Sequence, residues 1–529
     1  MRFMATGLPG IFLQNRPPRC VTLRGVKVSR ECSVVSLERP VESTGQTLMP
    51  NIIFILSDQH NPKFTGYEGH DAIKTPALDR LASEGVRFSN AYTPNPICVP
   101  ARYCLLSGLY SRDTRVYKNA DVPVADLPSF SRLLSEHGWR TCLVGKAHYT
   151  GDDQLRGYEE RPYGDFLGVG HQSDPYRGAD PELQGPGGGG NHPVGGGFKL
   201  AGPSGIPEFQ LTENIITHEA VKFLQIHREA ERERPFFLSV HYPRPHFPYQ
   251  PPERWFQHYR TWAGGKLHPL SKEKIAERHP IDRTHWEHYL GYGASQDDLD
   301  RALAGYAGNV SYMDECIGHL LESIDHLGYP EDTYVIYSSD HGEMAGAHDL
   351  WHKQMFYEES ARVPLIVRGP GIASGMRCQS LVSLVDCFPT ISDLAGIEIP
   401  SHCAGESIVP FLTDPSQVRS ERCIFSEIAW RRGHEGAMVR KGPWKYCRFL
   451  EGEPVLFNLD RNESESENLA EDAEYEQVRE ELDAILLEFW QPDELEARRN
   501  ALPQVRNKGA YPVAMQYCLA DGSWVDAWP

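Results

Sequence analysis

The sequence has no apolar run long enough to cross a membrane and no excess of positive charge. Spanning a bilayer takes roughly 18 to 20 consecutive apolar residues, whereas the longest apolar runs, such as residues 51–56 and 333–337, have the length of a strand. The 529-residue chain has 53 Lys and Arg against 72 Asp and Glu residues, a net charge of −19. We therefore expect neither a membrane span nor a nucleic-acid partner held by phosphate contacts.

The twelve cysteines also lack any CxxC pair, although they extend from Cys20 to Cys518. This excludes the dense disulfide framework of small secreted proteins and gives no spacing typical of a structural zinc site. Residues 1–48 contain only a short apolar patch near residues 10–13 and no clear cleavage site, which is poor for a signal peptide. We expect a cytoplasmic location, with a periplasmic or secreted one as the alternative.

What the sequence does contain is an alternation of strand-like and helical segments. Buried strands are predicted at residues 51–56, 141–144, 235–240, 333–337 and 363–367. Helical patterns lie between them at residues 76–84, 129–136 and 303–327. This order predicts an α/β fold with a large, mainly parallel sheet flanked by helices.

Three further segments define the expected domain organisation. Residues 1–48 are expected to be a disordered extension, because Met49 directly precedes the first strong strand. The catalytic domain is expected over residues 49–423, with a flexible glycine-rich insertion at residues 174–205 that lacks a phosphate-loop pattern. A smaller C-terminal α+β subdomain is expected over residues 424–529, with antiparallel strands at 437–440, 444–446 and 455–457 and a helix near 475–490.

Reactive side chains follow four of the predicted strands at their carboxyl ends. These are Asp58 and Gln59, Lys146 and His148, His246, and Asp340 and His341. A single Asp after a strand is often only a turn or cap residue, but parallel strands end at one edge of the sheet, so the repetition favours a common site. Carboxylate and amide oxygens with one imidazole suit a hard divalent cation, and Ca²⁺ better than Zn²⁺.

A second pattern is Cys98-Val-Pro-Ala-Arg102. Proline suits the first turn of a helix, so Cys98 is expected at a helix N-terminus, where backbone N–H groups favour an anion. Arg102 lies four residues later on the same helix face and can reach the same anion. The alternative is a buried structural cysteine beside a surface arginine.

The segment from Cys98 to Arg102, followed by Ser107-Gly108, resembles the signature of type I sulfatases of the alkaline-phosphatase-like superfamily. The resemblance covers roughly residues 50–490. Its other motifs are Asp58-Gln59, Gly145-Lys-Ala-His148, Pro245-His246, Asp340-His-Gly342, Trp351-His-Lys353, Arg362-Val-Pro364, Val385-Asp-Cys-Phe-Pro-Thr390, Leu456-Phe-Asn-Leu459 and Glu467-Asn-Leu469. It implies a sulfuric ester hydrolase in which residue 98 is oxidised to formylglycine by a formylglycine-generating or anaerobic maturing enzyme.

The resemblance also implies roles for individual residues. The implied metal ligands, for one Ca²⁺ per chain, are Asp58, Gln59, residue 98, Asp340 and His341. The implied catalytic residues are Cys98, Arg102, Lys146, His148, His246 and Lys353. Residue 98, as the formylglycine hydrate, attacks the sulfur atom, and Arg102 and Lys146 hold the negative charge. His148 removes a hydrate proton, while His246 and Lys353 contact the sulfate group and protonate the leaving oxygen.

Two alternatives to this activity stay open. Many family members carry Asp where this chain has Gln59 and Asn where it has His341. The aspartate-histidine pair Asp340-His341 also resembles that of phosphonate monoester and phosphodiester hydrolases. The form of the loop at residues 145–148 favours a sulfatase. The other alternative is a catalytically silent protein that binds a sulfate ester without maturation of Cys98.

The substrate is expected to be a sulfated carbohydrate or a small alkyl sulfate. Residues 146–161 show local similarity to choline-sulfatase-like members of the family.

Overall fold

The computed structural model describes residues 49–164 except 120, 125 and 152, residues 201–417 except 291 and 292, residue 419, and residues 421–430 and 433–492. It also gives the backbone of three short strands, β13 (Gln504–Asn507), β14 (Met515–Cys518) and β15 (Trp524–Asp526). The expected extension over residues 1–48 and the insertion up to residue 200 lie outside the described residues. No helix of the described part is long and apolar enough to span a membrane.

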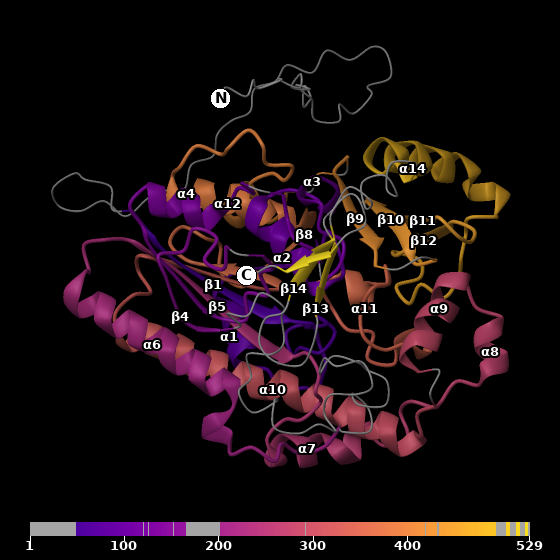
Figure 1. Cartoon of the computed structure of the whole chain (residues 1–529), viewed down its shortest axis with the longest axis horizontal. Helices are drawn as coiled ribbons and strands as arrows, with labels where there is room; N and C mark the ends of the chain where they lie inside the picture. Colours follow the sequence, from indigo (N-terminus) through magenta and orange to yellow (C-terminus); the bar gives the residue numbers. More distant parts are fainter. Residues whose placement is uncertain are drawn as a thin grey trace, which may run out of the picture. The chain divides into compact units, whose positions relative to one another are not determined.

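A large sheet lies at the centre of the fold (Figure 1). It has eight strands in the order β4-β3-β5-β1-β6-β7-β2-β8. Its strands are β1 (Asn51–Asp58), β2 (Val86–Tyr92), β3 (Arg140–Gly145), β4 (Glu160–Gly164), β5 (Phe236–Pro245), β6 (Thr333–Ser339), β7 (Leu365–Arg368) and β8 (Met376–Ser383). Within this sheet only β7 runs antiparallel to its neighbours β6 and β2. The predicted mainly parallel α/β sheet is therefore confirmed.

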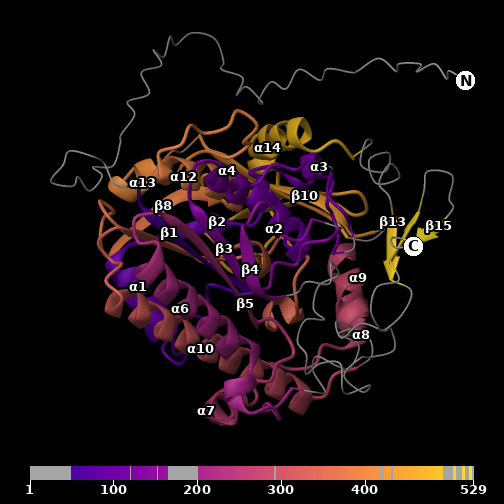
Figure 2. The same ribbon diagram turned by 60° about the vertical axis from the view of Figure 1, so that its left-hand side comes forward.

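Helices cover both faces of this sheet because its central strands are apolar on both faces. Ile53 and Ile55 of β1 pack toward α1, α6 and α10, whereas Ile52, Phe54 and Leu56 pack toward α2, α4 and α12. Figure 2 shows these two groups of helices on opposite sides of the sheet. These helices are α1 (Pro76–Glu84), α2 (Cys98–Ser107), α4 (Phe130–Glu136), α6 (Thr212–Ala230), α10 (Gln296–His326) and α12 (Cys387–Ala395). Burying each such aliphatic side chain contributes roughly 1.5–3 kcal/mol, so the two cores hold the strand ends in a fixed frame.

Helix α10 begins seven residues before the predicted start at residue 303. Ser295 caps it: its hydroxyl accepts the N–H of Asp298, and the Asp298 carboxylate accepts the N–H of Ser295 at 2.9 Å. This reciprocal capping box satisfies two otherwise unpaired N–H groups. The apolar periodicity alone did not reveal this polar first turn.

The predicted C-terminal antiparallel sheet is also present, with strand order β12-β11-β10-β9. Its strands are β9 (Cys423–Ala429), β10 (Glu435–Lys441), β11 (Trp444–Phe449) and β12 (Val455–Asn458). Helix α14 (Glu476–Phe489) packs Leu482 and Leu486 against Val439 and Tyr446. The domain boundary between residues 423 and 424 stays a prediction.

The remaining helices are short or lie in the connections between strands. The α-helices are α3 (Ser111–Thr114), α7 (Glu253–Ala263), α8 (Lys272–Ala276), α9 (Pro280–Tyr289), α11 (Glu358–Ala361) and α13 (Val409–Thr413). The 3₁₀ helices are η3 (Glu208–Gln210), η4 (Ala347–Asp349), η5 (Leu384–Asp386) and η6 (Ala473–Tyr475).

Asp282 on α9 makes the stability of the fold depend on pH. The residue is 3% exposed, and burial raises its pKa to about 6, although the Tyr357 hydroxyl donates a hydrogen bond to it at 3.2 Å. Between about pH 4 and 6 the folded protein keeps a proton that the unfolded chain has released. The contribution of Asp282 to the free energy of unfolding therefore falls as pH rises, by about 3 kcal/mol in all.

We expect the Asp282→Asn substitution to remove this dependence. The variant should match the parent protein in thermal midpoint near pH 4 and exceed it near pH 7, measured by thermal unfolding across that range. A difference between the two midpoints that does not change with pH would contradict this account.

Candidate active site and metal centre

The register of the sheet brings two aspartates together. Strands β1 and β6 are parallel neighbours with Ser57 opposite Ser339, and each strand is followed or ended by an aspartate, Asp58 and Asp340. Both carboxylates are fully buried. The third element is α2, which begins at Cys98 as expected, with Ile97 in an extended conformation as its N-cap.

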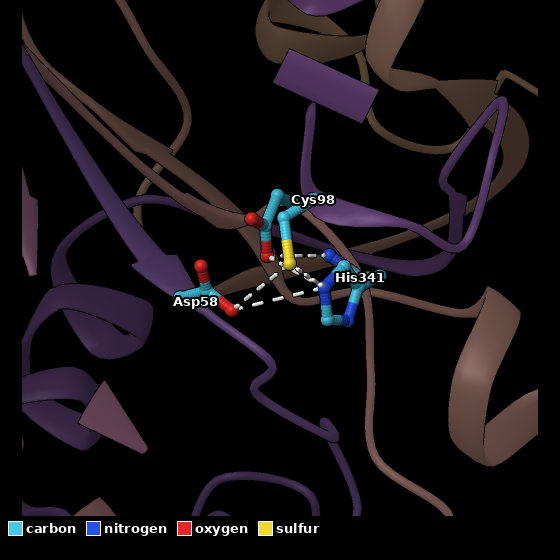
Figure 3. Close-up of side chains that lie close together, drawn as sticks. Asp58, Cys98 and His341 are labelled. Carbon is cyan, nitrogen blue, oxygen red and sulfur yellow. Dashed lines mark hydrogen bonds and ion pairs between the residues drawn. The ribbon is translucent and has the colours of Figure 1, made fainter. Parts of the chain in front are cut away.

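Asp58, Cys98, Asp340 and His341 each direct one ligand atom at a common point. These atoms all lie within 4.8 Å of one another. Cys98 Sγ is 3.1 Å from His341 Nε2 and 3.7 Å from Asp58 Oδ1. Figure 3 shows the three side chains directed toward one another. His341 Nε2 lies 3.6 Å from Asp340 Oδ1.

This donor set fits a divalent cation. His341 Nδ1 lies 2.9 Å from the carbonyl oxygen of Gly342, so it carries the proton and leaves the Nε2 lone pair facing the carboxylates. Carboxylate oxygens and an imidazole nitrogen that face one another in a buried place are donors of the kind that bind divalent metals. Asp58, Asp340 and His341 are the residues that could hold the ion, with residue 98 beside them.

Two cationic side chains contact the outer oxygens of Asp58 and Asp340, which do not face Cys98 and His341. Arg102 Nε donates to Asp340 Oδ2 at 2.8 Å, and its Nη2 donates to Asp58 Oδ2 at 3.2 Å. Lys146 Nζ lies 2.5 Å from Asp58 Oδ2. Asp58 Oδ1 is thereby left facing Cys98 and His341. The arginine predicted to share the face of Cys98 thus holds the two aspartates in place.

Gln59, Lys353 and His246 form a row next to this centre. Lys353 Nζ lies 2.7 Å from Gln59 Oε1 and 2.7 Å from His246 Nε2. The backbone N–H of His246 donates to the backbone oxygen of Asp58 at 3.0 Å, which fixes the histidine at the end of β1. His148 lies just beyond the end of β3, is 1% exposed and has a φ of +58°.

The electric field of the site sets the protonation of its groups. Burial alone would raise the pKa of Asp58, but the permanent charges of Lys146 and Arg102 hold it well below its usual value. Burial lowers the pKa of His148 far below its usual value, and Lys146 and Arg102 lower it further. The pKa of His246 is likewise held low by burial and by Lys353. Near neutral pH the carboxylate is therefore charged and both imidazoles are neutral.

The thiol of Cys98 and the imidazole of His341 influence each other. Burial and Asp58 oppose ionisation of the thiol, but Lys353 and His341 bring the pKa of Cys98 below its usual value. Burial lowers the pKa of His341, whereas Asp340 and Cys98 more than offset this and raise it. The helix N-terminus at Cys98 favours negative charge in the same place.

Glu343 is a site residue that the sequence patterns did not single out. It is fully buried and accepts hydrogen bonds from the side-chain amide of Gln59, from the Tyr249 hydroxyl and from two backbone N–H groups. The signal available in the sequence was its position two residues after His341 at a strand end.

A second group of candidate metal ligands, His348, Glu359 and Glu465, also has its ligand atoms within 4.8 Å of one another. Here Lys445 Nζ lies 2.6 Å from Glu465 Oε1, and Glu465 Oε2 accepts a backbone N–H at 2.7 Å. Both oxygens of Glu465 are therefore engaged in an ion-pair network. Asp58, in contrast, keeps one oxygen directed at the other ligand atoms.

Comparison with known proteins gives two family matches. A model described as "Sulfatase" matches residues 50–397, and a model described as "N-sulphoglucosamine sulphohydrolase, C-terminal" matches residues 346–491. A choline-sulfatase from Rhizobium meliloti is 31% identical over 439 residues, covering 80% of this chain and 82% of the relative. An ulvan-active sulfatase from Formosa agariphila is 28% identical and covers 85% of this chain and 82% of the relative.

Two solved structures show the same fold. The phosphonate monoester hydrolase of Agrobacterium radiobacter superposes with a TM-score of 0.68 at 24% identity and covers 91% of this chain and all of its own. A protein solved in complex with its substrate D-glucosamine-2-N,6-O-disulfate superposes with a TM-score of 0.65 at 23% identity and covers 85% of this chain and 98% of its own. The family match over most of residues 50–491, together with the similarity to the choline-sulfatase, shows that the chain belongs to the sulfatase family of sulfuric ester hydrolases.

Proposed function

We propose that this sulfatase releases inorganic sulfate from the sulfate ester of a sugar or a small alcohol, using formylglycine made from Cys98 and a bound Ca²⁺. The observation that carries the proposal is the contact of Cys98, at the N-terminus of α2, with Asp58 and His341 in a buried ligand set. The named relatives act on choline sulfate in one case and on ulvan in another, which supports both substrate classes.

Asp58, Asp340, His341 and Gln59 are the residues that would hold the cation. Their donors are mostly oxygen atoms, which favours Ca²⁺ over softer metals. A cation held by these residues, together with formylglycine at position 98, would supply an activated oxygen nucleophile and would neutralise negative charge on the sulfate group.

The protein's own side chains orient the substrate and carry protons. Arg102 and Lys146 hold the two aspartates in place through contacts of 2.5–3.2 Å, and they keep Asp58 ionised. Lys353 Nζ, which lies 2.7 Å from the acceptor Nε2 of His246, can bind a sulfate oxygen and deliver a proton to the leaving oxygen, and His246 lies beside it to contact the sulfate group. His148 has a neutral imidazole that can accept a proton in the site.

A substrate panel tests the reaction class. We expect sulfate release from choline sulfate or a 6-sulfated amino sugar, with a kcat/KM at least about 100-fold above that for a phosphonate monoester. Faster turnover of the phosphonate monoester or of a phosphodiester would favour the alternative hydrolase. Binding of the sulfate esters without any turnover, by protein with unmodified Cys98, would favour the binding protein.

Removal of the metal tests the cation site. Chelation followed by dialysis should lower sulfate release by at least about 100-fold, because the negative charge on the sulfate group is then no longer neutralised. It should also lower the thermal midpoint, because a ligand that binds only the folded state stabilises it. Ca²⁺ should restore both quantities, and Mg²⁺ should do so less well because it demands a tighter octahedral site. Full activity in protein shown by elemental analysis to be metal-free would contradict the cation site.

A maturing enzyme is the partner that the proposal requires. Protein produced with a formylglycine-generating enzyme should carry the modification at residue 98.

A further inference from the structure

We propose that Glu343 is a positioning residue that fixes the side-chain amide of Gln59 and, through it, Lys353 and His246. The positioning role follows from the contacts of these side chains, and the reaction that they serve is the one given by the proposed function, on which this part of the proposal rests. Its basis is a continuous chain of hydrogen bonds, from Glu343 to Gln59, from Gln59 to Lys353 and from Lys353 to His246.

Glu343 is held rigidly at one end of this chain. Its Oε1 atom accepts the backbone N–H groups of Ala345, at 3.0 Å, and of His352. Its Oε2 atom faces the Tyr249 hydroxyl at 3.3 Å and the Nε2 atom of Gln59. Because two backbone groups hold one oxygen, the other oxygen has a fixed direction.

The backbone of Gln59 is equally fixed. Its N–H donates to Asp340 Oδ1 at 3.1 Å, and its carbonyl oxygen accepts the Tyr306 hydroxyl at 2.9 Å. The side chain is fully buried. The remaining freedom of this residue is the orientation of its amide.

The two partners of that amide select one orientation. A carboxylate can only accept a hydrogen bond and an ammonium group can only donate one. Nε2 must therefore face Glu343 and Oε1 must face Lys353. In the flipped amide, oxygen would meet carboxylate and NH₂ would meet ammonium, which is unfavourable at both ends in a buried site.

The consequence is that Glu343 aims the amide oxygen of Gln59 at Lys353, and under the proposed function this oxygen would also be a ligand of the cation. An aspartate or glutamate at position 59 could not donate to Glu343, so Gln59 and Glu343 form a matched pair. Lys353 in turn is placed with its Nζ atom 2.7 Å from both Gln59 Oε1 and His246 Nε2.

The Glu343→Gln substitution tests this orientation without changing the volume of the side chain. The new amide must keep its oxygen toward the N–H groups of Ala345 and His352, so its NH₂ group faces Gln59. The Gln59 amide then meets a donor on both sides. We expect Ca²⁺ affinity, measured by calorimetric titration of the metal-free full-length protein, to weaken by about 10–100-fold, and kcat to fall by a similar factor with a smaller change in KM.

The double variant Gln59→Glu/Glu343→Gln provides a rescue. A carboxylate at position 59 accepts hydrogen bonds from both the new amide and Lys353, so both contacts are satisfied again. We expect Ca²⁺ affinity and kcat to recover at least about tenfold from the single variant. The proposal would be overturned if the double variant recovered neither Ca²⁺ affinity nor kcat although its cooperative thermal unfolding shows that it is folded.

Two further variants keep the test decisive. Glu427→Gln makes the same change at a residue that is 2% exposed and accepts the backbone N–H of Arg112 at 2.8 Å, and it should leave Ca²⁺ affinity and kcat within about twofold. If Glu343→Gln does not fold, the Gln59→Glu variant tests the proposal in its place. Its new carboxylate would face the Glu343 carboxylate and repel it, so Ca²⁺ binding should weaken despite the added negative charge.

Tighter Ca²⁺ binding by Gln59→Glu with undiminished turnover would overturn the proposal, as would unchanged Ca²⁺ affinity and kcat in folded Glu343→Gln. A parent protein that binds Ca²⁺ but releases no sulfate from any ester would instead count against the proposed function. The calcium titration would still measure the positioning role.

Discussion

The Cys98→Ala variant is expected to lose sulfate release by about four orders of magnitude or more, because the group that forms formylglycine is gone. The fold should persist, since Cys98 is the first residue of α2 and alanine is a strong helix former. The measurement is sulfate release by matured parent and variant proteins, with thermal unfolding of both.

Cys104 supplies the matched control on the same helix. It is also fully buried, but its Sγ atom lies 3.6 Å from the Ser111 hydroxyl, and burial raises its pKa well above the usual value. Cys104→Ala should cost about 1–2 kcal/mol of stability and leave turnover near that of the parent. Equal activity of Cys98→Ala and Cys104→Ala would contradict the assignment of residue 98.

The Asp340→Asn variant has the second largest expected effect. Asp340 Oδ1 accepts the N–H groups of Gln59 and His341 at 3.1 and 2.9 Å, and Oδ2 accepts from Arg102 at 2.8 Å. An amide in this place keeps its oxygen toward the two backbone groups and turns its NH₂ group toward Arg102. We expect at least about a 1,000-fold loss of kcat and of Ca²⁺ affinity.

The same substitution should destabilise the protein by about 3 kcal/mol, because it leaves the buried Arg102 with Asp58 as its remaining carboxylate partner. Chemical unfolding and calcium titration measure the two effects separately. Asp314→Asn is the control, because that buried carboxylate caps α1 through the N–H groups of Ala77 and Leu78 and should cost stability alone. Normal calcium binding by Asp340→Asn would contradict the metal site.

Much of the fold follows from local patterns in the sequence. The cores of β1, β3, β5 and β6 are apolar runs buried on both faces, which is the pattern typical of central parallel strands. Strands β4 and β8 lie at the edges of the sheet and are more polar, so the same rule missed them. The run at residues 363–367 indicated β7 but carried no information on its antiparallel direction.

The site likewise has features that local sequence patterns predict and features that they do not. The positions of Asp58 and Asp340 follow from adjacent parallel strand ends, which periodicity can predict. Lys353 lies in the long connection between β6 and β7, so only the family resemblance indicated it. The orientation of the Gln59 amide depends on Glu343 and Lys353, which lie 284 and 294 residues away in the chain, and no local pattern encodes such contacts.

The most direct test of the account is to compare the formylglycine content of residue 98 with the rate of sulfate release. Protein made with and without a maturing enzyme gives preparations with different contents, and peptide mass spectrometry detects the modification as a loss of about 18 Da from the Cys98 peptide. The account predicts that the rate of sulfate release rises in proportion to the modified fraction and extrapolates to zero without it. A rate that does not depend on the modified fraction would contradict the assignment of residue 98 as the reactive group.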